Sequence, residues 1–171
     1  DPKYLKLEQL LLNEGWARKG CIIFSQYYDT VWWLAEKMVR SGKFADQKIA
    51  IYAGGDKSGM FIDGEFVRRP KEDLKRMVKT GELKIIFGTD AASEGLNLQT
   101  LGTLINIDLP WNPTRLEQRK GRIQRIGQKF DVIQIYNMRY AGSVEDKVHK
   151  VLAERLKYFN EIFGQVPDTL E

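Results

Sequence analysis

Two arginines that follow a glutamine make up the clearest candidate for chemistry on phosphate in this sequence. They lie in the string Gln-x-x-Gly-Arg-x-x-Arg-x-Gly-Gln, which begins at Gln118 and places arginines at 122 and 125. If the turn after Gly121 is helical, Arg122 and Arg125 share a face, with Gln118 one turn earlier. Two guanidinium groups on one face can bind the oxygens of a phosphoryl group, where charge develops during transfer. We therefore predict a catalytic site at Gln118, Arg122 and Arg125.

The positive charge of the chain is concentrated around these arginines. Residues 115–129 hold six basic residues and one acid, so this segment carries +5, whereas the whole chain of 171 residues carries +4. Such a segment is typical of a phosphate-binding site, but a solvated basic turn has the same composition.

The expected elements place further small and polar residues where a ligand can reach them. Apolar, β-branched runs predict strands at 21–25, 48–53, 84–88, 103–108 and 132–138, and helical patterns lie at 4–14, 29–41, 70–79, 113–120 and 143–163. This alternation predicts an α/β fold, a parallel sheet with helices on both faces. Asp63-Gly64 between apolar residues predicts a small inserted β-hairpin.

Ligands gather at the carboxyl ends of the strands in such a sheet. Ser25, Thr89 and the Gly54-Gly55 pair follow predicted strands or lie at their ends, and their small size allows close approach of a phosphate. The two glycines can equally form an ordinary turn.

Composition excludes several classes of protein. The content of 43% hydrophobic and 29% charged residues is that of a folded chain, not of a disordered or fibrous one. The single cysteine, Cys21, opens an apolar run and excludes an internal disulfide, and with only His149 beside it the chain lacks the ligands of a usual zinc site. No apolar run is long enough to span a bilayer, so we expect no membrane partner and a cytoplasmic (nucleoid-associated) or nuclear location.

Taken together, these segments resemble the second RecA-like lobe of superfamily 2 nucleic-acid-dependent ATPases, in particular the Swi/Snf family of DNA translocases. The arginine string is similar to the family's motif VI, and residues 89–98, ending in Glu-Gly-Leu-Asn-Leu, are similar to motif V. Trp-Asn-Pro at 111–113 resembles a hallmark of the Swi/Snf branch, and Phe-Ser-Gln at 24–26 resembles motif IV. Tyr-Ala-Gly-Gly at 52–55 lies where the family places the segment that follows its second strand. At 91–94 the chain has Ala-Ala-Ser-Glu where many eukaryotic members have a glycine pair, which favours a bacterial or archaeal branch.

The resemblance implies a RecA-like domain spanning 1–171, paired with an N-terminal ATP-binding lobe that this chain does not contain. ATP with Mg²⁺ would be held mainly by that lobe, because the chain has no Gly-x-x-x-x-Gly-Lys-Ser/Thr string and no strand ending in an Asp-Glu pair. The fragment alone is expected to be inactive, and no residue of this chain is assigned to a metal. The implied site residues fall into three groups: Gln118, Arg122 and Arg125 for catalysis; Gly95, Asn97 and Gly121 for the nucleotide; Ser25, Gly54, Gly55, Thr89 and Asn112 for nucleic acid.

The implied activity is ATP-dependent translocation on double-stranded DNA. Two alternatives remain open at this stage: a lobe that acts on RNA or on RNA polymerase, and a non-catalytic nucleic-acid-binding module. Trp-Asn-Pro at 111–113 argues against the RNA-helicase alternative.

Overall fold

A computed structural model of the chain describes residues 1–90 and 95–163. The described residues form a seven-stranded sheet with the order β4-β3-β2-β5-β1-β6-β7. The strands are β1 (Cys21–Ser25), β2 (Ile49–Tyr52), β3 (Gly59–Ile62), β4 (Glu65–Arg68), β5 (Ile85–Thr89), β6 (Thr103–Asn106) and β7 (Gln134–Asn137). The helices are α1 (Pro2–Leu12), α2 (Trp16–Lys19), α3 (Tyr28–Arg40), α4 (Lys71–Thr80), α5 (Pro113–Ile123) and α6 (Val144–Phe163).

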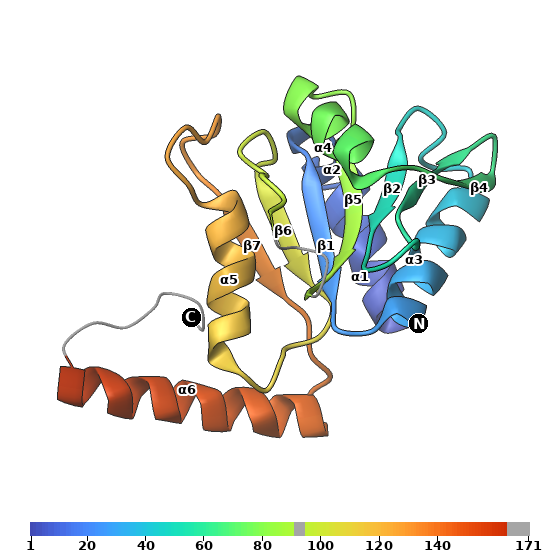
Figure 1. Cartoon of the computed structure of the whole chain (residues 1–171). Coiled ribbons are helices and arrows are strands. Elements are labelled where there is room, and N and C mark those ends of the chain that lie inside the picture. Colours follow the sequence, from blue (N-terminus) through green and yellow to red (C-terminus); the bar gives the residue numbers. More distant parts are fainter. Residues whose placement is uncertain (91–94, 164–171) are drawn as a thin grey trace.

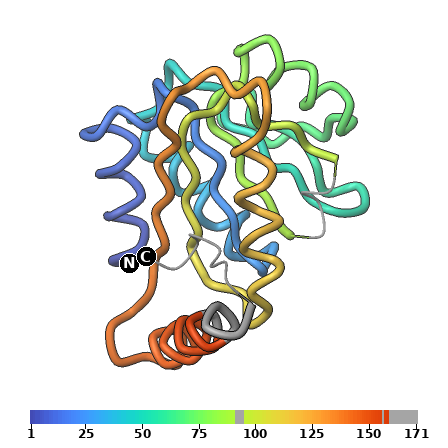
Figure 2. Tube along the Cα trace, turned by 90° about the vertical axis from the view of Figure 1, so that its left-hand side faces the viewer, coloured from blue at the N-terminus to red at the C-terminus, as the bar shows by residue number. Residues whose placement is uncertain are grey.

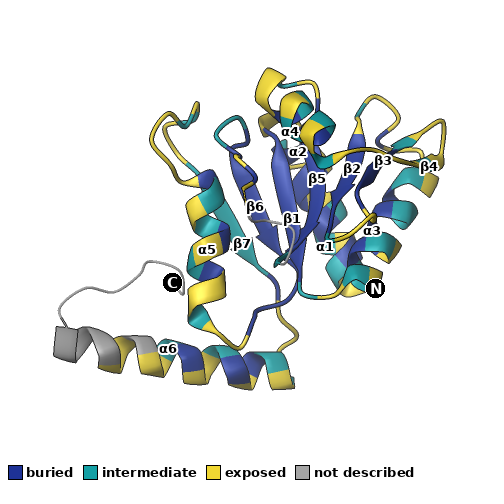
Figure 3. Cartoon of the chain, viewed as in Figure 1, coloured by how far each residue is buried: buried dark blue, intermediate teal, exposed yellow. Residues whose placement is uncertain are grey.

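Five strands are parallel and form the centre of the molecule. β1 pairs with β5 and β6, β2 with β5, and β6 with β7, all in parallel. α1 and α3 cover one face of the sheet, and α4 and α5 cover the other (Figures 1 and 2). Every residue of β1, β2, β5 and β6 is buried, as Figure 3 shows, which explains why these strands read as continuous apolar runs. The predicted RecA-like α/β sheet is confirmed.

The core thiol behaves as the sequence predicts. Cys21 begins β1 and is completely buried. Burial raises the pKa of its thiol to about 12, which keeps it protonated at neutral pH.

Local sequence signals begin and end the helices close to the predicted positions. Asp1 caps α1, since its carboxylate accepts hydrogen bonds from the backbone N–H groups of Lys3 (2.7 Å) and Tyr4 (3.2 Å). α4 ends at Gly81, whose φ of 79° suits a residue without a side chain. The four-residue helix α2 is an addition to the predicted elements, because a single helical turn has too short a periodic pattern to be detected.

The predicted hairpin forms the outer edge of the sheet. Asp63 and Gly64 join β3 to β4, and both have positive φ (51° and 82°), as a tight two-residue hairpin turn requires. Phe61 and Phe66 from the hairpin stack against Trp32 of α3, with ring centroids 5.6 and 4.9 Å from it. The hairpin is therefore anchored to the body by an aromatic cluster.

Helix α6 lies across the end of the molecule at which the parallel strands finish (Figure 1). Its first turn is joined to α1 by the ion pair between Lys3 and Glu145 (2.8 Å), and Val148 and Leu152 further along the helix are buried. Among the described residues, none of the helices has the length and apolar character needed to cross a membrane.

Candidate functional site

The structure brings together the segment after β5 and the segment at the end of α5. The backbone N–H of Leu98 donates to the carbonyl oxygen of Arg122 (3.1 Å), and the N–H of Lys129 donates to the carbonyl of Gln99 (3.0 Å). The Gln99 side chain also bonds the carbonyl of Ile126. Residues 95–101 and 122–129, which overlap the segments that resemble motifs V (89–98) and VI (118–128), are thus joined by hydrogen bonds into one unit.

Helix α5 carries the predicted catalytic residues, with one correction. The helix continues through Gly121 to Ile123, so Gln118 and Arg122 are one turn apart, as expected. Gln124 caps the helix, and Arg125 lies beyond it in a bend. The prediction that Arg122 and Arg125 share a helical face is therefore wrong, because the helix ends between them. Their catalytic roles, and that of Gln118, stay predictions.

Tyr52 and Lys75 form a cluster that sequence reasoning missed. Tyr52, at the end of β2, is buried, and this burial raises the pKa of its hydroxyl, while the positive charges of Lys75 and Arg122 oppose the rise. Lys75 of α4 forms an ion pair with Glu72 (3.0 Å), and this pair and the neighbouring Tyr52 raise the pKa of its ammonium group. The positive charges of Lys75 and Arg122 thus both act on one buried tyrosine.

The predicted nucleotide-binding residues Gly95 and Asn97 lie beside this cluster. Gly95 has a φ of 79°, and a Cβ atom there would lie 3.7 Å from the Nζ atom of Lys75. Asn97 is exposed and bonds Gln99 twice, through the Gln99 side chain (2.9 Å) and backbone N–H (3.1 Å). Both residues line a cavity of about 380 Å³ together with Lys75, Arg76 and Lys79 of α4.

The third predicted nucleotide-binding residue, Gly121, is exposed on α5. A Cβ atom at this position would meet no other atom within 4 Å, so the surface around Gly121 is open. Residues 91–94 of the motif V segment lie outside the described residues.

Arg119 is a buried arginine at this site, and its role was not foreseen from the sequence. Its side chain is 1% exposed. Its guanidinium donates to both carboxylate oxygens of Asp90 (2.5 and 2.8 Å), to the side chain of Asn106 (2.8 Å) and to the carbonyl of Asp108 (3.1 Å). The guanidinium also lies 5.2 Å from the centre of the Phe24 ring. Arg119 therefore connects α5 to the carboxyl ends of β1, β5 and β6.

A signal for this role exists in the sequence. Leu116, Arg119 and Ile123 follow one another at helical spacing, and all three are buried. An arginine on the apolar face of a helix needs a buried partner, which Asp90 provides.

The residues predicted to contact nucleic acid lie at the carboxyl ends of the strands, with different exposure. Gly54 and Gly55 begin the loop after β2, with open space around both. Thr89 and Ser25 are buried, and the Ser25 hydroxyl donates to a carboxylate oxygen of Asp108 while accepting from the N–H of Tyr27 (3.1 Å). Asn112 is exposed and caps α5 by accepting a hydrogen bond from the Thr114 N–H (3.0 Å).

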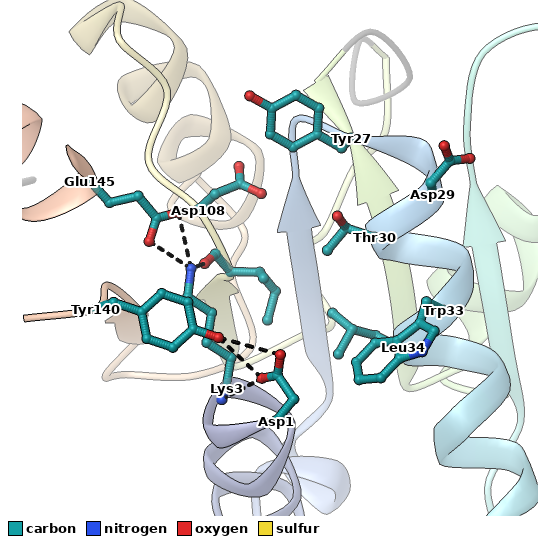
Figure 4. Close-up of a pocket in the computed structure, with 11 residues that line it drawn as sticks. Asp1, Lys3, Tyr27, Asp29, Thr30, Trp33, Leu34, Asp108, Tyr140 and Glu145 are labelled. Atoms are coloured by element: carbon teal, nitrogen blue, oxygen red, sulfur yellow. Dashed lines mark hydrogen bonds and ion pairs between the residues drawn. The ribbon is translucent and has the colours of Figure 1, made fainter. Parts of the chain in front are cut away.

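A larger cavity, of about 490 Å³, lies near the carboxyl ends of β1 and β6. Figure 4 shows Tyr27 and Trp33 on one side of it and Lys3 and Tyr140 on the other. Lys3 is already engaged there, because its ammonium donates to the Ile107 carbonyl (2.6 Å) and to Glu145 (2.8 and 3.0 Å). None of the predicted site residues lines this cavity. In the described part of the chain no group of three or more metal-ligating side chains comes together.

The fold and the joined segments define the second RecA-like lobe of a helicase-type ATPase. Residues 2–127 match the model of the helicase conserved C-terminal domain, and the chain belongs to this family. This confirms the resemblance found in the motifs.

The similar proteins are helicases and related ATPases. The chain is 44% identical over 103 residues to "Uncharacterized ATP-dependent helicase YqhH" of Bacillus subtilis, covering 60% of this chain and 18% of that protein. It is 32% identical over 124 residues to "RNA polymerase-associated protein RapA" of Vibrio vulnificus, covering 68% of this chain and 13% of the relative. The chain thus spans less than a fifth of these relatives. Among solved structures, the C-terminal part of the Fun30 ATPase domain aligns with a TM-score of 0.64 at 20% identity, over 85% of this chain and 42% of that one.

Proposed function

We propose that the chain is the second lobe of an ATP-dependent translocase on double-stranded DNA, and that ATP with Mg²⁺ binds between this lobe and an N-terminal lobe. The observation that carries the proposal is the joining of residues 95–101 to residues 122–129. This unit carries Arg122, whose positive charge acts together with that of Lys75 on Tyr52, and Gly95 lies beside Lys75. Cations in this arrangement suit the phosphates of a nucleotide.

The described residues fit the phosphate part of ATP and not the metal. Arg122, Arg125 and Lys75 supply cationic donors, and Gly95 and Gly121 leave room for close approach. The sequence contains no phosphate-loop string, so the phosphate cradle and the carboxylates for Mg²⁺ are assigned to the other lobe. ATP supplies the phosphoryl group that is transferred to water.

In this proposal the residues of α5 have separate tasks. Arg122 and Arg125 bind the oxygens of the phosphoryl group as its charge develops. Gln118 lies one turn before Arg122 on the same helix and belongs to the same catalytic site. Arg122 comes from the helix and Arg125 from the bend after it, so the two arginines do not share one helical face. Closure of the two lobes brings both arginines to the nucleotide.

The same proposal assigns the carboxyl ends of the strands to the nucleic acid. Gly54, Gly55 and Asn112 are accessible there, and Thr89 and Ser25 lie behind them. Arg119 links this edge to α5, because it bonds Asp90 next to Thr89 and Asp108 next to the Ser25 hydroxyl. An RNA track is the second candidate. What favours it is that one relative, 26% identical over 147 residues, is named "ATP-dependent RNA helicase DBP8".

The proposal is tested by ATP hydrolysis of the isolated chain and of the complete protein that contains it, each with no nucleic acid, duplex DNA or RNA. We expect no turnover by the chain alone, and turnover by the complete protein that duplex DNA raises. Steady hydrolysis by the isolated, contaminant-free chain would contradict the two-lobe proposal. Stimulation by RNA and not by DNA would replace the DNA track by the RNA track.

A further inference from the structure

A second group of basic side chains lies far from residues 115–129 in the sequence, on and around the inserted hairpin. Four cations, from the loop after β2, from β4, from the segment after it and from the first residue of α4, make up what we call the hairpin basic patch: Lys57, Arg68, Arg69 and Lys71. Lys57, Arg68 and Arg69 are exposed, and Lys71 is half-buried.

The strand register places this patch at the carboxyl end of β2. Ile51 of β2 pairs with Gly59 of β3, and Gly59 pairs with Arg68 of β4. The backbone N–H of Arg69 donates to the carbonyl of Ser58 (3.1 Å). Arg68 and Arg69 therefore lie at the same edge of the sheet as the Gly54–Gly55 loop.

The two remaining members approach tyrosines at that edge. The Lys57 ammonium lies 4.4 Å from the centre of the Tyr28 ring, at the start of α3, and the Lys71 ammonium lies 5.4 Å from the Tyr52 ring. The positive charge of Arg68 opposes the rise that burial gives to the pKa of Tyr28. The patch is thus one cluster of cations around Tyr28 and Tyr52.

These cations differ from most of those on the neighbouring helices. On α4, Lys75 pairs with Glu72 and Arg76 pairs with Asp73, and on α3 Arg40 pairs with Glu36. No member of the hairpin basic patch forms an ion pair with a carboxylate in the described part of the chain. The nearest acids in the sequence are Asp56 beside Lys57, Glu65 in β4 and Glu72 after Lys71, and the last of these already pairs with Lys75. The four cations outnumber these three acids.

The hairpin holds the patch in a fixed position. Gly59 packs so closely against β4 that a Cβ atom there would lie 2.3 Å from the Val67 carbonyl oxygen. The rings of Phe61 and Phe66 are 5.3 Å apart and both pack on Trp32. Because this packing holds the backbone of the hairpin, little backbone entropy is lost when the patch binds a ligand.

We propose that the hairpin basic patch is an additional binding site for the sugar–phosphate backbone of nucleic acid. It extends the track from Gly54 and Gly55 toward the β4 edge of the sheet, and it binds without reading sequence. The positive charge, the edge shared with the Gly54–Gly55 loop and the adjacent tyrosines carry this assignment. It deepens the proposed function, on which it rests for the identity of the ligand.

The test compares two charge-matched double variants of the 171-residue chain. R68Q/R69Q removes two charges from the patch. R18Q/K84Q removes two charges from exposed residues at the opposite end of the parallel strands, where α2 ends and β5 begins. Binding to a fluorescent duplex of about 20 base pairs, and to single-stranded DNA and RNA of equal length, is measured over a series of KCl concentrations. Equal thermal midpoints first confirm that the variants fold.

We expect R68Q/R69Q to weaken duplex binding at least about fivefold. It should also reduce the slope of log Kd against log salt by about 1–2, because fewer counterions are released on binding when fewer phosphates are contacted. R18Q/K84Q should change Kd less than about twofold. Nucleic acid should also protect Lys57, and not Lys84, from acetylation. Equal effects of the two doubles, or no effect of R68Q/R69Q, would overturn the proposal.

A competitor and the complete protein separate the remaining explanations. Displacement of the duplex by polyglutamate at equal charge concentration would assign the patch to an acidic polypeptide and overturn the proposal. If the complete protein showed no ATPase activity, the proposed function would fail. The assignment of the hairpin basic patch would still stand on the binding results, because the binding assay needs no hydrolysis.

Discussion

At the scale of the residue, the most informative side chain is Arg119. Its hydrogen bonds join α5 to Asp90, Asn106 and Asp108, whereas the neighbouring arginines at 115, 122 and 125 are at least partly accessible. A basic run in a sequence does not reveal which of its members is buried. The helical spacing of Leu116, Arg119 and Ile123 does, but only once the helix is known to continue to Ile123.

Replacement of Arg119 by methionine is expected to destabilise the fold strongly. The change removes the hydrogen bonds that the guanidinium donates to Asp90, Asn106 and the Asp108 carbonyl, in a site that is largely closed to water. Breaking a buried pair from one side costs about 3–5 kcal/mol. Urea unfolding of the isolated chain measures this loss.

The control is R115M on the same helix, where the side chain is exposed. It should change the free energy of unfolding by no more than about 0.5 kcal/mol. Similar losses in both variants would mean that the Arg119 contacts contribute nothing beyond the charge of the helix.

At the scale of the element, the end of α5 and the bend after it decide the geometry of the site. Gln128 holds this bend, because its side-chain nitrogen donates to the carbonyls of Ile123 (2.7 Å) and Leu101 (3.0 Å), and its side-chain oxygen accepts from the Phe130 N–H (3.1 Å). The sequence contains the glutamine but not its partners, since Leu101 comes from a segment 27 residues earlier. The helix itself was predictable from its proline start and spacing; its bend was not.

Replacement of Gln128 by alanine is expected to loosen the bend without unfolding the sheet. The loss of these side-chain hydrogen bonds should lower the free energy of unfolding by about 1–3 kcal/mol and speed hydrogen exchange at the Lys129 and Phe130 amides. Gln124, exposed in the same bend, is the matched control, and its alanine variant should leave these rates unchanged. Equal exchange in the two variants would contradict a holding role for Gln128.

At the scale of the whole molecule, continuous apolar runs predicted the five parallel strands, and Asp63-Gly64 predicted the hairpin. Both follow from local chemistry: strands buried on two faces need apolar residues throughout, and a tight turn needs positive φ. The grouping of Lys75 with Arg122 and Tyr52, and of Lys57 with Arg68, depends instead on which strands become neighbours. Strand order is not written in any one segment, so these clusters required the structure.

The central claim is that Arg122 acts on the charge that develops during phosphoryl transfer. The most direct measurement is of kcat and ATP affinity, taken separately, for R122K, R122A and the control K129A in the complete protein. Lys129 is exposed in the same joined unit and is not among the residues assigned to the nucleotide, so K129A controls for loss of charge. We expect both Arg122 variants to lower kcat by a factor on the order of 10³ with little change in ATP affinity. Lysine should not rescue activity, because it cannot reproduce the two-pronged contact of a guanidinium. K129A should keep a kcat near that of the parent protein. Equal, modest losses in all three variants that added salt reproduces would contradict the claim and leave residues 115–129 as a general basic surface.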